Sequence, residues 1–146
     1  MKPYAPTILR IAVGTVVFAH GAQKVLGVWG GPGFHGTILM VRHLGLVYPA
    51  ALGVLVALTE FVGGILLIAG AFARWAALAL TIEMCVATWK VHWPNGFFGH
   101  GIEFNVVLIG ALLSLIITGA GALSFDERRS RSREAKAAGR ARARTV

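Results

Sequence analysis

The side chains that could do chemistry in this chain are ionisable and polar groups embedded in long apolar stretches. Two are carboxylic acids, Glu60 and Glu83, each in the middle of an apolar run. Carboxyl groups in apolar surroundings hold protons tightly, which suits them to proton exchange with a quinone or to another acid–base step. The candidate ligand-binding groups are His20, Lys24, Lys90, His92, Glu103 and Asn105.

The composition explains why these groups are unusual. The 146 residues are 56% apolar and only 14% charged, with a mean hydropathy of +0.71, whereas a soluble domain is about 45–50% apolar and about 25% charged. A single small domain cannot bury so much apolar surface in one core. The sequence therefore predicts an integral membrane protein and excludes a cytosolic enzyme, a disordered chain and a disulfide-stapled module. The lone Cys85 excludes an internal disulfide.

The apolar segments predict an all-α fold, an integral membrane four-helix bundle formed by residues 1–123. A membrane-spanning helix needs roughly 20 mostly apolar residues. Four stretches qualify: 5–28, 48–72, 75–93 and 102–122. They lack the alternation of barrel strands. The first is longer than the apolar region of a signal peptide and is expected to be retained. A short amphipathic segment, 34–46, is expected to lie at the membrane interface.

The last residues, 124–146, differ in composition from the rest of the chain. They hold eight bases and three acids, and hence five of the eight net positive charges. We expect a disordered basic tail, which the positive-inside rule places in the cytoplasm together with the N-terminus. Its expected contact is anionic lipid. A nucleic-acid partner is not expected, because no aromatic residue is interleaved with the arginines after Phe125.

Helical spacing predicts which polar groups share a face. Glu60 and Glu83 fall near mid-membrane at a rise of about 1.5 Å per residue, and His20 and Lys24 are four residues apart on one face. A second face carries Glu83, Ala87 and Lys90. Small residues flank Glu60 on its own helix and let a neighbouring backbone approach closely: Gly53, Ala57 and Gly64. Glu60 should therefore face protein, and one polar pocket should open outward.

Other ionisable residues are interpreted as structural. Arg10 is close enough to the inner end of its span to snorkel into the headgroups, and Arg74 lies in a tight loop. The five histidines are lone residues without metal-ligand spacing, so no metal site is predicted.

Several segments, taken in this order, resemble the DoxX family of small bacterial membrane proteins. They are Arg10-Ile-Ala-Val-Gly14, His20-Gly21-Ala-Gln-Lys24, Glu60-Phe-Val-Gly63-Gly64, Gly101-Ile-Glu103-Phe-Asn105 and Gly121-Ala-Leu-Ser124-Phe-Asp126. The resemblance covers residues 9–126. It implies a four-helix bundle in the bacterial inner membrane, often labelled an oxidoreductase. Because the chain has no dithiol, any redox cofactor or partner protein would come from elsewhere.

Three functions follow from these patterns. The first is a membrane subunit of a redox system that binds quinone or a small sulfur or oxygen substrate. Glu60 and Glu83 would exchange protons there, while His20, Lys24 and Lys90 orient the substrate. The second is a non-catalytic scaffold that docks soluble redox enzymes through its basic tail. The third is a small transporter, since polar groups at mid-depth can mark a path.

Overall fold

The computed structural model describes residues 4–99 and 101–143, which are helical wherever they are regular. The six α-helices are α1 (Tyr4–Leu26), α2 (Gly33–His43), α3 (Pro49–Ala69), α4 (Ala73–Ala87), α5 (Glu103–Thr118) and α6 (Phe125–Ala143). Short 3₁₀ turns lie at Val28–Gly30 (η1) and Trp93–Asn95 (η3), and a π-helical turn at Thr88–His92 (η2). No strand occurs in the described ranges, so the predicted all-α class is confirmed.

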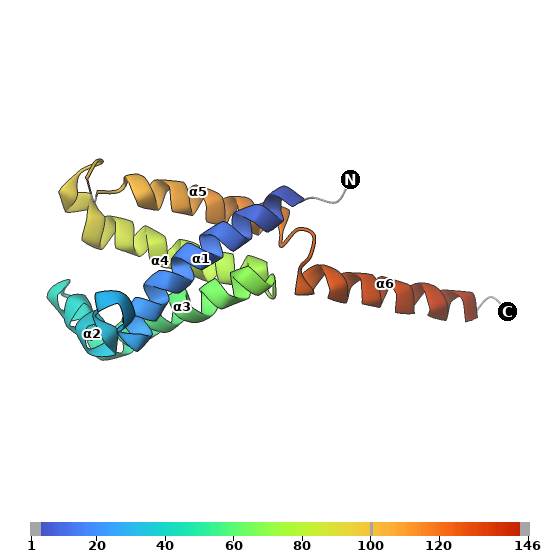
Figure 1. The fold of residues 1–146 in the computed structure, drawn as a ribbon, viewed down its shortest axis with the longest axis horizontal. Coiled ribbons are helices and arrows are strands. Elements are labelled where there is room, and N and C mark those ends of the chain that lie inside the picture. The colour runs from blue at the N-terminus through green and yellow to red at the C-terminus, as the bar shows by residue number, and fades with distance from the viewer. Residues whose placement is uncertain (1–3, 100, 144–146) are drawn as a thin grey trace.

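α1, α3, α4 and α5 pack side by side, and α2 lies against one end of α1 and α3 (Figure 1). α1 packs along α3, α3 along α4, and α4 along α5, while α2 contacts α3 and α1. Their shared core is apolar and consists of small and branched side chains, among them Val17, Leu67, Ala77, Leu80, Leu112 and Leu115. Two groups of polar contacts are packed against this core. One is formed by Arg10 and the other by the Lys24–Glu60 ion pair.

The outer surface of these helices is apolar. Leu55 and Ile65 on α3, Ile82 on α4, and Val107 and Ile117 on α5 are all more than 40% exposed. Among the described helices, α1 and α3 are long and apolar enough to cross a membrane, and α5 is a shorter apolar helix of 16 residues. An apolar exterior of this extent is expected for helices that face lipid rather than water.

Glycines bring α1 and α3 into backbone contact. A Cβ atom added at Gly21 would lie 2.3 Å from the Phe61 backbone nitrogen, and one added at Gly64 would lie 2.5 Å from the Phe18 nitrogen. The helices can approach this closely only because both residues lack a side chain. The predicted close approach at the small-residue face of α3 is therefore confirmed, and Glu60 on that face is only 4% exposed.

Arg10 lies at the end of the bundle where α3 ends and α6 begins, and it is fully buried, at 1% exposure. Its guanidinium donates hydrogen bonds to backbone carbonyls at the end of α3 and in the segment before α6: Leu67 (2.9 Å), Ile68, Ala120 (2.9 Å) and Leu123 (2.9 Å). The last carbonyls of a helix lack partners within the helix and carry its negative dipole end. Arg10 is thus a structural clamp, which we call the arginine knot, and the prediction that it snorkels is wrong.

Residues 125–143 of the predicted tail form the helix α6, so the predicted disorder is wrong for them, and residues 144–146 lie outside the described residues. Ser124 accepts a hydrogen bond from the Glu127 backbone nitrogen (3.1 Å), which caps the start of α6. Asp126 accepts hydrogen bonds from the Phe72 and Ala73 nitrogens, at 2.9 and 3.0 Å, and so caps α4 as well. Ser124-Phe-Asp-Glu127 is the capping-box spacing that predicts a helix start, and the many alanines and arginines that follow favour helix.

Candidate functional site

The site is built around an ion pair between α1 and α3. The Lys24 ammonium lies 2.5 Å from Glu60 Oε1, and the two side chains are 20% and 5% exposed. Gly14, Gly21 and Lys24 recur at helical spacing on the face of α1 that meets α3. The close approach at Gly21 therefore brings Lys24 onto Glu60 rather than into water. We call Lys24, Glu60 and Glu83 the carboxylate cluster.

Glu83 completes the cluster from α4. It lies close enough to Glu60 and Lys24 to interact electrostatically with both. Of the predicted cluster of Glu60, Glu83, His20 and Lys24, the structure brings Glu60, Glu83 and Lys24 together, whereas His20 is exposed.

The cluster lacks donors. Glu60 Oε2 and both oxygens of Glu83 are buried, and no donor within the described residues reaches them. Buried acceptors without donors are uncommon in folded proteins and costly. With one ammonium for two carboxylates, the cluster has room for a proton or for a hydrogen-bond donor from a ligand.

Asn105 and Glu103 have partners of their own at the start of α5. The buried Asn105 side chain donates a hydrogen bond from Nδ2 to Thr88 Oγ1 at 3.1 Å. Glu103 accepts one from the Gly99 backbone nitrogen at 3.2 Å, which closes the loop between α4 and α5. These contacts place both residues on the α4–α5 side of the bundle, and no described contact joins them to the carboxylate cluster.

The two basic candidates Lys90 and His20 do not enter the cluster either. The Lys90 ammonium lies over the ring of its neighbour Trp89, 4.1 Å from the centroid. The predicted face of Glu83, Ala87 and Lys90 is interrupted because residues 88–92 form a π-helical turn, which has more residues per turn than an α-helix. His20 is exposed, with its ring 6.3 Å from that of Phe104. His92 is half-buried in the π turn.

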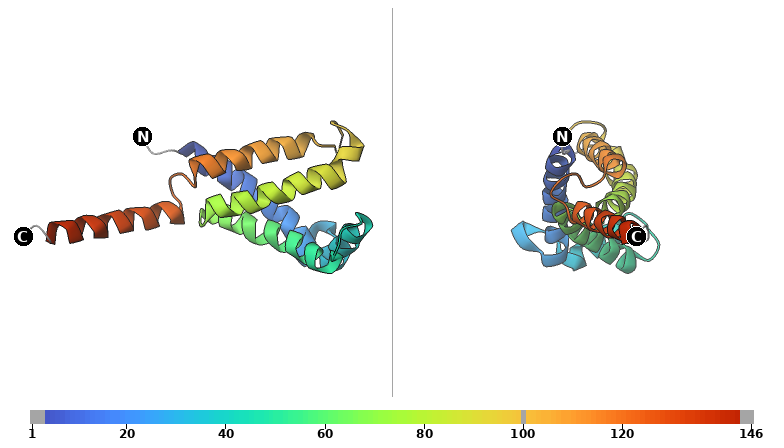
Figure 2. Two further views of the ribbon diagram at one scale, coloured as in Figure 1. Left: turned by 180° about the vertical axis from the view of Figure 1, so that it is seen from behind. Right: turned by 90° about the vertical axis from the view of Figure 1, so that its right-hand side faces the viewer.

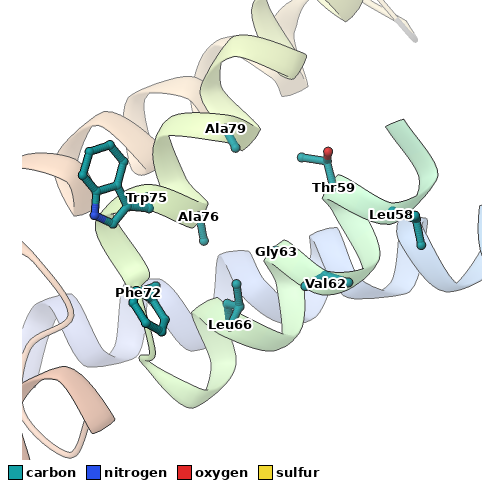
Figure 3. Close-up of a pocket in the computed structure, with 9 residues that line it drawn as sticks. All are labelled: Leu58, Thr59, Val62, Gly63, Leu66, Phe72, Trp75, Ala76 and Ala79. Atoms are coloured by element: carbon teal, nitrogen blue, oxygen red, sulfur yellow. The ribbon is translucent and has the colours of Figure 1, made fainter. Parts of the chain in front are cut away.

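A groove of about 440 Å³ runs between α3 and α4 (Figure 3). It is almost wholly apolar. Leu58, Val62, Leu66, Trp75 and Ala79 are among its lining residues, and Thr59 supplies a hydroxyl at one end. Ala76, Ala79 and Glu83 recur on α4 at spacings of three and four, so Glu83 lies one turn beyond the groove on the same helix face.

Comparison with known proteins identifies the chain. The DoxX family profile matches residues 5–93, more than half of the sequence. The chain belongs to the DoxX family. Every member of the carboxylate cluster lies within the matched range, whereas α5 and α6 lie beyond it.

Curated relatives of this DoxX-family chain are bacterial. It is 33% identical over 136 residues to an uncharacterized protein of Haemophilus influenzae, covering 87% of this chain and 92% of the relative. It is 31% identical to "Putative oxidoreductase CatD" of Bacillus subtilis, with 82% of each chain covered. It is also 31% identical to "Inner membrane protein YphA" of Escherichia coli, covering 87% and 91%. No solved structure matches. The family and these relatives establish a membrane protein.

Sequence reasoning missed three features of this DoxX-family site. The groove has no sequence signal, because its lining residues look like any lipid-facing apolar residues. The Asn105–Thr88 hydrogen bond joins residues 17 positions apart and depends on helix packing. Gly21 could have been singled out, since it lies three residues before Lys24 on the same helix face.

Among the described residues, no group of three or more His, Cys, Asp or Glu side chains is arranged to hold a metal ion.

Proposed function

We propose that this chain is the membrane subunit of a redox system, in which the carboxylate cluster exchanges protons with a quinone. The alternative to quinone at this site is a small sulfur or oxygen substrate. The observation that carries the proposal is the set of three buried carboxylate oxygens without donors beside a single lysine. Structural ion pairs satisfy their acceptors, whereas a site that loads and releases protons must leave acceptors open.

The topology belongs to the proposal as well. We propose that α1, α3, α4 with its π turn, and α5 each cross a bacterial inner membrane as a four-helix bundle. The basic α6 supports cytoplasmic N- and C-termini, since positive charge concentrates on the cytoplasmic side. The apolar surface of α3, α4 and α5 supports contact with lipid.

In this proposal the cluster holds one proton between Glu60 and Glu83. Two like charges at one buried site favour protonation of one carboxyl, and Lys24 compensates the remaining negative charge. The Lys24 side chain is more exposed than that of its partner, at 20% against 5% for Glu60. It therefore lies on the route by which protons from water would reach the carboxyls.

The groove supports quinone as the substrate. A quinone has an apolar tail and a ring whose two carbonyl oxygens each take up a proton when two electrons reduce it. The groove between α3 and α4 offers apolar surface for the tail, and it ends one helical turn from Glu83. Glu83 would give one proton to a ring oxygen and be reloaded through Glu60, and the second proton would reach the other ring oxygen from water. The two electrons would come from a partner redox protein.

Equilibrium binding of decylubiquinone tests this proposal, with the full chain in lipid nanodiscs and titration calorimetry as the measurement. We expect binding by the wild type and an affinity at least tenfold weaker in Glu60→Gln and Glu83→Gln. Glu134→Gln, the same change on α6, should bind like the wild type. Absence of binding by the wild type, or unchanged affinity in both cluster variants, would contradict the proposal.

A scaffold that docks soluble redox enzymes is the second candidate, and the exposed basic helix α6 favours it. The scaffold function predicts that α6, and not Glu60, is needed in cells. Deleting the residues after Asp126 should abolish the activity of the protein in cells, whereas Glu60→Gln should leave that activity unchanged. For the transporter, solute flux in proteoliposomes should exceed that of empty vesicles.

A further inference from the structure

The charges on α6 are divided between two faces of the helix. Arg129, Arg133, Lys136 and Arg140 follow one another at spacings of four, three and four residues, so they share one face. We call these four residues the basic stripe. It extends about 16 Å along the helix, at about 1.5 Å per residue. All four side chains are exposed, and none of them has a partner among the described residues.

The opposite face of α6 carries the acidic residues and is turned towards the bundle. Glu127, Ser130, Arg131 and Glu134 line a polar cavity of about 640 Å³ together with the loop before α6 and the start of α4. On this face Arg131 pairs with Glu127, and Ser130 donates a hydrogen bond to Glu134 at 3.1 Å. The basic stripe therefore points away from this cavity.

No acidic residue of the chain is left to neutralise the basic stripe. The chain has six acidic residues. Glu60 and Glu83 lie in the carboxylate cluster, and Glu103 closes a loop. Asp126 caps α4, and Glu127 and Glu134 lie on the other face of α6. Any negative charge that meets the stripe must come from another molecule.

The direction of α6 indicates where that molecule lies. α6 continues beyond the end of the bundle, roughly along its long axis (Figures 1 and 2). Its start is held firmly, because Asp126 bonds the first turn of α4 and the Asp126 nitrogen donates to the Gly70 carbonyl at 3.1 Å. In a membrane-spanning bundle this direction leads away from the headgroups, so most of the stripe lies in water.

We propose that the basic stripe is a docking surface for an acidic face of a soluble protein. A straight row of like charges without an apolar residue recognises its partner by charge complementarity and spacing. An amphipathic helix that lies in the membrane interface would instead need an apolar face. After Phe125, α6 consists only of charged residues, serine, alanine and glycine, so it has no such face. This inference rests on the second candidate function, docking through α6, and does not depend on the carboxylate cluster.

The test uses two designed helical peptides with equal numbers of glutamates, one with the glutamates at stripe spacing and one with them spread around the helix. Binding to the full chain in phosphatidylcholine nanodiscs is measured by fluorescence anisotropy at fixed salt. We expect the wild type to prefer the striped peptide at least fivefold. The variant Arg133→Gln/Lys136→Gln/Arg140→Gln should lose that preference.

The matched control removes three charges outside the stripe, as Arg128→Gln/Arg131→Gln/Arg142→Gln, and should keep the preference. Circular dichroism checks that both variants retain the helix, since glutamine favours helix about as well as arginine. Equal losses in the two variants would show diffuse charge attraction and overturn the proposal. It would also be overturned if phosphatidylglycerol nanodiscs suppressed peptide binding, which would make lipid the partner, or if duplex DNA bound more tightly than the striped peptide.

Discussion

Two regions of the bundle each bury charge but treat it in opposite ways. In the arginine knot, Arg10 donates hydrogen bonds to four backbone carbonyls and is 1% exposed. In the carboxylate cluster, three buried oxygens have no donor among the described residues. A satisfied buried charge holds segments together, whereas an unsatisfied one carries a cost that function must explain. The first region stabilises the bundle, and the second is, in our proposal, a site that exchanges a proton or a ligand.

Replacing Arg10 should cause the largest loss of stability. Each buried carbonyl left without a donor costs roughly 1–3 kcal/mol, so we expect Arg10→Met to lower the free energy of unfolding by about 3 kcal/mol or more. Thermal unfolding in detergent, followed by circular dichroism, measures this. Arg74→Met is the control, because Arg74 is exposed and makes one 3.3 Å hydrogen bond to Ile117. A similar effect of both substitutions would show that the knot is not a special structural element.

Gly21→Ala should damage the carboxylate cluster. The new methyl group would overlap the Phe61 backbone, so α1 must move away from α3 and take Lys24 with it. We expect a loss of about 1–3 kcal/mol together with weaker quinone binding. Gly110→Ala on α5 is the matched control, because a Cβ there meets nothing within 4 Å. That substitution should be neutral or stabilise by about 0.5–1 kcal/mol. Normal quinone binding in Gly21→Ala would show that the α1–α3 contact at Gly21 is not needed to form the quinone site.

Ser124→Ala should have a smaller effect, confined to the end of the bundle where α6 begins. Loss of a helix cap costs about 0.5–2 kcal/mol, and Ser124 caps α6. Amide hydrogen exchange should therefore become faster in the first turn of α6, while the bundle helices exchange as in the wild type. Ser132→Ala, an exposed position within α6, serves as control. Unchanged exchange at the start of α6 would mean that Asp126 and the loop hold the helix without this cap.

Glu83→Gln should have the smallest effect on stability and a large effect on function. The substitution replaces a carboxyl that lacks donors by a neutral amide that can donate to Glu60 Oε2. We expect the melting temperature to stay the same or rise slightly, while quinone binding falls. A clear drop in melting temperature would show that Glu83, like Arg10, stabilises the fold. The carboxylate cluster would then not differ from the arginine knot in its role.

Much of the fold could be predicted from composition and spacing, because apolar runs of this length form helices that bury one face against each other. Glu60, Glu83 and Lys24 were found because ionisable residues are conspicuous in apolar sequence. Arg10 was misjudged because its partners are backbone carbonyls, which no side-chain pattern reveals. Lys90 was misplaced because a π turn changes the spacing. The capping-box residues Ser124 and Glu127 predict the start of α6. The high charge of the segment favours disorder instead, and that signal was given more weight.

Infrared spectroscopy of the carboxyl groups tests the central claim most directly, since a protonated carboxyl has a C=O stretch separate from that of a carboxylate. We predict that the full chain in nanodiscs at neutral pH shows one protonated carboxyl whose band shifts in D₂O. The band should disappear in Glu83→Gln or Glu60→Gln and persist in Glu134→Gln. A wild type without a protonated carboxyl, or a band that survives in both cluster variants, would contradict the claim that the carboxylate cluster holds an exchangeable proton.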